Sequence, residues 1–107
     1  MPEKIILHVG PHKTGSTAIQ LAMASSRSAL LDEGILYPQS GCVSSAHHWV
    51  SRYCEGSGTT FDPGEIRAEA EEASVVVISS ENFVLLAADG FARFRALFPK
   101  TPIRVIY

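Results

Sequence analysis

Long apolar runs and an excess of charge of one sign are both lacking in this sequence of 107 residues. The run before Gly10 is too short for the core of a signal peptide or for a membrane span. The formal net charge is only -2, so we expect no broad basic surface for nucleic acid. Any anion must be bound by a small local group of residues. These absences predict a cytoplasmic protein with no membrane and no nucleic-acid partner.

Cysteine is scarce, and the chain contains only Cys42 and Cys54. A disulfide between them would suit an exported protein, but no export signal is visible, so we expect free thiols. An alternative is a zinc site in which these thiols join His47 and His48. The short Cys-x-x-Cys spacing typical of zinc sites is lacking, and we therefore predict no metal.

The composition that remains is that of an ordinary globular protein, with 46% hydrophobic and 19% charged residues. The length allows one domain or part of one, and not two separate cores. No internal repeat or low-complexity tract is present. We expect residues 1–107 to belong to a single domain.

Short apolar runs alternate with helical segments along the chain. Residues 4–9 lack strict alternation, which favours a central parallel strand buried on both faces. Two further strands are expected at 74–79 and 103–107, and helices at about 15–33, 46–53, 62–73 and 91–98. This order predicts an α/β fold of three layers, with helices flanking a parallel sheet and ligands bound at the carboxyl ends of its strands.

Local signals mark the ends of these elements. Gly34 is placed to end the first helix in the left-handed conformation, and Asp62 to cap a helix that Pro63 opens. Residues 35–38 are expected to run extended. The apolar residues of the first helix fall roughly on one stripe, typical of a helix that packs on a core: Ile19, Met23 and Leu30.

The chain stops at Tyr107, within an apolar strand, whereas domains usually end at an exposed polar boundary. We therefore expect a domain that is incomplete at its C-terminus. The edge of its sheet at 103–107 would be exposed and apolar, which would allow copies of the chain to associate.

The segment Gly10–Thr17 carries the clearest chemistry, because four residues separate its two glycines and two hydroxyl residues then open a helix. This spacing is that of a P-loop, in which inward-facing N–H groups and the positive end of a helix dipole bind a phosphate. In nucleotide triphosphatases a lysine follows the second glycine directly. Here Ser16 has that place and Lys13 lies inside the loop, which disfavours an ATP-dependent kinase.

The run Lys13-Thr14-Gly15-Ser16-Thr17 resembles the Lys-[Ser/Thr]-Gly-[Thr/Ser]-Thr loop of sulfotransferases that use 3′-phosphoadenosine-5′-phosphosulfate. The stretch Ile6–Gln20 is similar to that family's opening strand, loop and helix. The resemblance implies that Lys13 bonds the bridging oxygen of the donor and offsets the charge of the leaving group. It also implies that donors to the phosphosulfate come from Thr14, Gly15, Ser16 and Thr17.

Two further expectations follow from the same resemblance. The reaction needs no metal, and an arginine and a serine that hold the 3′-phosphate of the donor would lie beyond Tyr107. His12, within the loop, either contacts the donor or only shapes the turn.

Candidates for the acceptor side follow the second predicted strand. Glu81 lies where an acceptor would meet the donor, and its position resembles one at which the family places a general base. Alternatively, Glu81 caps the following turn or pairs with a basic residue such as Arg52. His47 and His48 are candidates for the base or for binding the acceptor, unless they are only surface or partly packed residues.

The aromatic residues near these histidines, Trp49 and Tyr53, either stack on a sugar ring or fill core space, and His8 is expected to be a hydrogen-bonded core residue. The sequence thus predicts a sulfotransferase that acts on a hydroxyl or amine of a small molecule or glycan. Two alternatives stay open, an ATP-dependent P-loop kinase and a non-catalytic P-loop binding module.

Overall fold

The computed structural model describes residues 2–9, 16–43, 45–56, 61–71 and 73–106. Within these residues the chain forms a parallel sheet of four strands in the order β2-β3-β1-β4. The strands are β1 (Lys4–His8), β2 (Ile35–Leu36), β3 (Val75–Ser79) and β4 (Ile103–Ile106). The predicted α/β class with a parallel sheet flanked by helices is confirmed.

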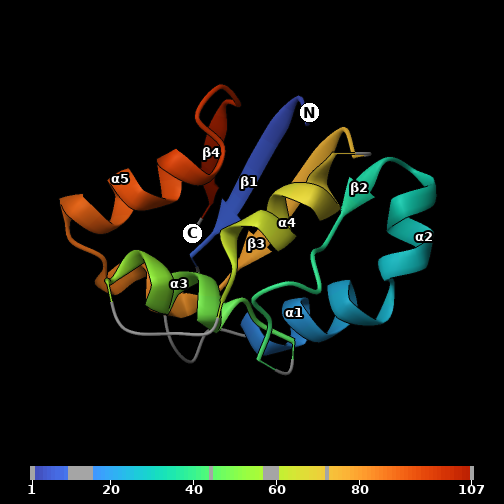
Figure 1. Ribbon diagram of the computed structural model, residues 1–107. Coiled ribbons are helices and arrows are strands. Elements are labelled where there is room, and N and C mark those ends of the chain that lie inside the picture. Colours follow the sequence, from blue (N-terminus) through green and yellow to red (C-terminus); the bar gives the residue numbers. More distant parts are fainter. Residues whose placement is uncertain (1, 10–15, 44, 57–60, 72, 107) are drawn as a thin grey trace.

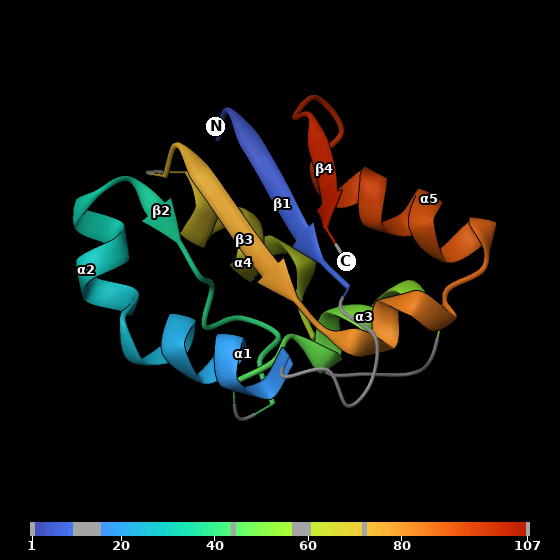
Figure 2. The ribbon, with the colours of Figure 1, turned by 180° about the vertical axis from the view of Figure 1, so that it is seen from behind.

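Helices connect successive strands. The chain passes from β1 to β2 through α1 (Ser16–Ser25) and α2 (Arg27–Asp32), and from β2 to β3 through α3 (His48–Cys54) and α4 (Pro63–Ala70). The 3-10 helix η1 (Glu81–Leu85) and α5 (Ala88–Leu97) lead from β3 to β4. Figure 1 shows α4 in front of the sheet, whereas α1 is nearer the viewer in the reverse view of Figure 2, so these two helices lie on opposite sides.

The core lies mainly on the face of the sheet that α4 and α5 cover. Ile5 and Leu7 of β1 are buried in one cluster with Ile66 of α4 and Phe94 of α5. The alternate position Ile6 is only partly buried, so β1 alternates and the expected burial of this strand on both faces is wrong for the described structure. The face of the sheet that bears Ile6 is therefore covered less completely than the face that bears Ile5 and Leu7.

The helix α1 explains part of this difference. Ile19, expected on its apolar stripe, is 51% exposed, and Met23 is only partly buried. The buried side chain of the helix is the polar Gln20. Because Gln20 points to the carboxyl ends of the strands, α1 packs there through polar contacts instead of laying an apolar stripe across the sheet.

The local signals at helix ends are confirmed. Gly34 has a φ of 80°, in the left-handed region that favours glycine, and it follows the end of α2. The carboxylate of Asp62 accepts a hydrogen bond of 2.9 Å from the backbone N–H of Gly64, so it caps α4. The single helix expected at 15–33 is divided in two at Ser26.

One strand was not expected as a strand. Residues Ile35 and Leu36 pair in parallel with Val75 and Val76, so an extended segment extends the sheet beyond β3. On the opposite side β4 is the outermost described strand, and its Val105 and Ile106 are 42% and 41% exposed. Of the helices that the structure describes, none has the length and apolar character needed to cross a membrane.

Candidate functional site

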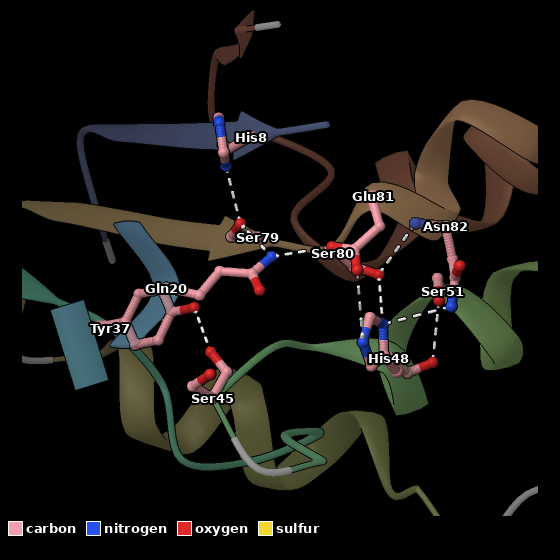
Figure 3. A network of polar contacts seen from close by, with 10 residues as sticks. All are labelled: His8, Gln20, Tyr37, Ser45, His48, Ser51, Ser79, Ser80, Glu81 and Asn82. Atoms are coloured by element: carbon pink, nitrogen blue, oxygen red, sulfur yellow. Dashed lines mark hydrogen bonds and ion pairs between the residues drawn. The ribbon is translucent and has the colours of Figure 1, made fainter. Parts of the chain in front are cut away.

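The carboxyl ends of β1 and β3 lie side by side, because the two strands pair in parallel with His8 opposite Ser79. The chain continues from Ser79 into η1, and the helices α1 and α3 contribute Gln20 and His48 to the same edge (Figure 3). In open α/β sheets, ligands bind outside the carboxyl ends of strands. The polar groups gathered here form the candidate site.

One half of the network is centred on the amide of Gln20, whose side chain is buried. Its Nε2 donates to Ser79 Oγ and to Glu81 Oε2, each at 3.0 Å. Ser79 Oγ also lies 2.8 Å from His8 Nδ1. The hydroxyl of Ser79 thus joins the buried amide of Gln20 to the ring of His8 at the end of β1.

The other half is centred on His48, at the start of α3. Its Nδ1 lies 2.7 Å from Ser80 Oγ and 3.2 Å from the amide nitrogen of Asn82. An amide N–H can only donate, so Nδ1 of His48 accepts and its Nε2 carries the hydrogen. That Nε2 lies 4.0 Å from Glu81 Oε1, and the two side chains are 25% and 20% exposed, so both are within reach of a ligand.

His47 points in the opposite direction and is fully buried. Its Nδ1 accepts a hydrogen bond of 3.0 Å from the backbone N–H of Ser79, and its Nε2, 2.8 Å from the carbonyl of Pro38, donates there. Burial lowers the pKa of His47 to about 4, since water no longer solvates the charged ring. The neutral ring therefore joins the segment after β2 to the end of β3.

The buried ring of Tyr37 packs edge to face against His47, with 4.6 Å between the ring centroids. Its hydroxyl donates to the carbonyl of Ser45, and burial raises its pKa, so it stays neutral. The rings of Tyr37 and His47 are both buried, so they pack under the carboxyl edge of the sheet and are not accessible to a ligand.

Most residues predicted to bind the donor lie outside the described part of the chain, namely His12, Lys13, Thr14 and Gly15. Ser16 and Thr17 begin α1, and only their backbone is described. The strand before this loop and the helix after it are present as expected. The donor-binding roles stay predictions.

On the acceptor side, the structure brings Glu81 and His48 together and directs the ring of His47 away from them. Glu81 begins η1, and Ser80 Oγ accepts from the backbone N–H of Asn82, so Ser80 caps this turn. The guanidinium of Arg52, considered as a partner for Glu81, lies over the ring of Trp49 at 4.9 Å. The roles of Glu81, His47 and His48 in catalysis or binding stay predictions.

Sequence reasoning did not find Gln20, although it lies at the centre of the network. The available signal was a polar residue between the apolar Ile19 and Leu21, which does not by itself indicate burial. His8 was expected in a hydrogen bond and makes one with Ser79. Tyr53 packs edge to face on Phe61, with 5.5 Å between centroids, so it fills space at the core.

Within the described ranges, no group of three or more His, Cys, Asp or Glu side chains is arranged to hold a metal ion. Both cysteines are free thiols, and burial raises the pKa of Cys54 to about 12. Comparisons of the chain with protein-family models, with curated proteins and with solved structures give no match. A function is therefore inferred from the loop sequence and from this edge of the sheet.

Proposed function

We propose that the protein is a sulfotransferase that moves a sulfuryl group from 3′-phosphoadenosine-5′-phosphosulfate to a hydroxyl or amine of a small-molecule or glycan acceptor. One observation carries the proposal. The loop Gly10–Thr17, which resembles the donor loop of that family, joins β1 to α1, and Glu81 follows the adjacent strand β3. The residues proposed to bind the donor and the residue proposed to activate the acceptor thus follow two strands that are neighbours in the sheet.

The donor half of the proposal rests on charge. A sulfuryl group carries less negative charge than a phosphoryl group, so Lys13 and the N-terminus of α1 can offset the charge that develops on the leaving phosphate without a magnesium ion. Gly10 and Gly15 have no side chain that would hinder close approach of the backbone to the phosphosulfate.

The acceptor half uses a carboxylate as general base. As the acceptor oxygen or nitrogen attacks sulfur, the bond between sulfur and the bridging oxygen breaks, and the nucleotide leaves with that oxygen. Glu81 takes the proton of the acceptor, and His48, with its Nε2–H facing Glu81 Oε1, orients and stabilises the carboxylate. The partial exposure of both side chains leaves an acceptor room to approach.

A cytoplasmic location is part of the proposal. It is supported by the two free thiols, since disulfides are rare in that compartment.

The proposal is tested by incubating the purified protein with the sulfur-labelled donor and a panel of phenols, amines and oligosaccharides. Transfer of label to at least one class is expected. Calorimetric titration with the desulfated nucleotide, which keeps the 3′-phosphate, measures binding independently of the acceptor. Magnesium-dependent binding of ATP without binding of this nucleotide would instead identify a kinase. Donor binding without turnover on any acceptor would support a binding module.

A further inference from the structure

We infer that Gln20 is a positioning residue for Glu81, whose carboxylate it fixes at the edge of the sheet and connects to α1. The contact itself does not depend on the proposed reaction. Only its catalytic consequence rests on the proposed function, through the role of Glu81 as base.

Burial is the first observation that singles out Gln20. Its side chain is 2% exposed, whereas its neighbours Ile19 and Leu21 are each 51% exposed. A helix at the surface usually buries its apolar residues, and α1 does the reverse at this point. Because a buried amide without hydrogen-bond partners destabilises the fold, such a position is favourable only if the hydrogen bonds of the amide are made.

The geometry of the amide is the second observation. The two hydrogens of Nε2 are directed to Ser79 Oγ and Glu81 Oε2, both at 3.0 Å, so one nitrogen joins β3 to the candidate base. Rotation of the amide would break both bonds together. The carboxylate is therefore held from one side by Gln20 and faces His48 Nε2 on the other, at 4.0 Å (Figure 3).

An N–H donor favours the ionised form of a carboxylate, which is the form that can act as a base. Among the residues that the structure describes, the other titratable groups near this position are His48 from α3 and the hydroxyl of Tyr37, which burial keeps neutral. His8 is joined to it through Ser79. Among the described residues, Gln20 donates a hydrogen bond to Glu81, and the amide of Gln20 has no charge that changes with pH. Its loss is expected to let the carboxyl hold its proton to higher pH.

The test compares Gln20→Met, which keeps the length of the side chain but has no donor, with Gln39→Met as the matched control. Gln39 is an exposed glutamine whose backbone N–H, and not its side chain, bonds Glu69. The protonation midpoint of the Glu81 carboxyl carbon is followed by NMR and assigned with Glu81→Gln. We expect the midpoint to rise by about half a pH unit or more in Gln20→Met and to stay unchanged in the control.

The kinetic arm is a double-mutant cycle on kcat. Gln20→Met is expected to lower kcat about tenfold alone, and to have no further effect when Glu81 is already replaced by Gln. Equal effects in both backgrounds would show that Gln20 only supports the fold. An unchanged carboxyl midpoint in Gln20→Met would overturn the inference.

Two controls keep the outcomes separate. If Gln20→Met does not fold, Gln20→Asn replaces it, because the shorter amide remains polar but cannot reach Ser79 and Glu81 together, and the same shift is expected. If the wild-type protein transfers no sulfuryl group to any acceptor, the proposed function fails, and the NMR midpoint alone decides whether Gln20 controls Glu81.

Discussion

His47 holds Ser79 by two hydrogen bonds at once. The backbone N–H of His47 donates to the carbonyl of Ser79 at 2.7 Å, and the backbone N–H of Ser79 donates to Nδ1 of His47 at 3.0 Å. The end of β3 is thereby fixed to the segment that leads into α3. Glu81 lies two residues further along the chain, so the position of the candidate base depends on this contact.

The first prediction concerns the stability of the fold in acid. The pKa of His47 is about 4 in the folded protein and about 6.5 when unfolded, so between these values the unfolded chain binds more protons. Stability from this group is fully present above pH 6.5 and falls as the pH is lowered toward 4, by roughly 3 kcal/mol in total.

Urea unfolding at several pH values measures this loss. The variant His47→Gln is expected to be less stable at pH 7 but to lose less stability between pH 7 and pH 4. The matched control His48→Gln changes the neighbouring histidine, whose side chain is 25% exposed, keeps His47 and should retain the full decrease. An equal decrease in the free energy of unfolding of wild type and His47→Gln would show that His47 does not cause the loss of stability in acid.

The second prediction concerns the candidate donor loop. Lys13→Ala is expected to lower turnover roughly a hundredfold or more, because the lysine charge is most favourable in the transition state. The far-ultraviolet circular dichroism and the melting temperature should remain those of the wild type. Lys100→Ala, at an exposed position after α5, is the control for loss of one lysine charge. Unchanged sulfuryl transfer in Lys13→Ala would remove the central claim.

The third prediction is that the reaction needs no divalent metal. The loop has Ser16 where nucleotide triphosphatases have the lysine that precedes the hydroxyl residue of the magnesium site. Rates measured with and without an excess of chelator should therefore agree. A loss of activity in chelator that magnesium restores would show that the loop works as a triphosphatase loop does.

The fourth prediction concerns the outer strand of the described sheet. Val105 and Ile106 of β4 are each about two-fifths exposed, at 42% and 41%, and an apolar strand edge can pair with another copy. Sedimentation velocity should show association that increases with concentration, and Val105→Lys should reduce it. Arg104→Lys keeps the charge of the same strand and is the control. Equal association in all three proteins would place the contact elsewhere.

The sequence predicted the fold where the determining interactions are local. The strand at Val75–Ser79 and the cap at Asp62 were found because their patterns need only neighbouring residues. The brief strand β2 was missed as a strand, since two residues acquire that state only by pairing with Val75 and Val76. Burial of one face of β1 likewise depends on where distant helices pack.

The site shows the same limit. The sequence named Glu81 and the pair of histidines, but adjacent residues at the start of a helix point in different directions, and only the fold decides which one is buried. Gln20 was missed because its partners, Ser79 and Glu81, are 59 and 61 residues away in the chain. The segment Gly10–Thr17 was singled out because its sequence resembles a donor loop, and most of it lies outside the described residues, so its role stays a prediction.

The position of β1 at the centre of the sheet also affects how the chain can fold during synthesis. Both neighbours of β1, namely β3 and β4, come from the second half of the sequence. While a ribosome is still making α4, the apolar strand β1 has been made but neither of these two neighbours has, and long-range pairing of this kind is slow. We therefore expect nascent chains to depend on chaperones that cover extended apolar segments until β3 has left the exit tunnel.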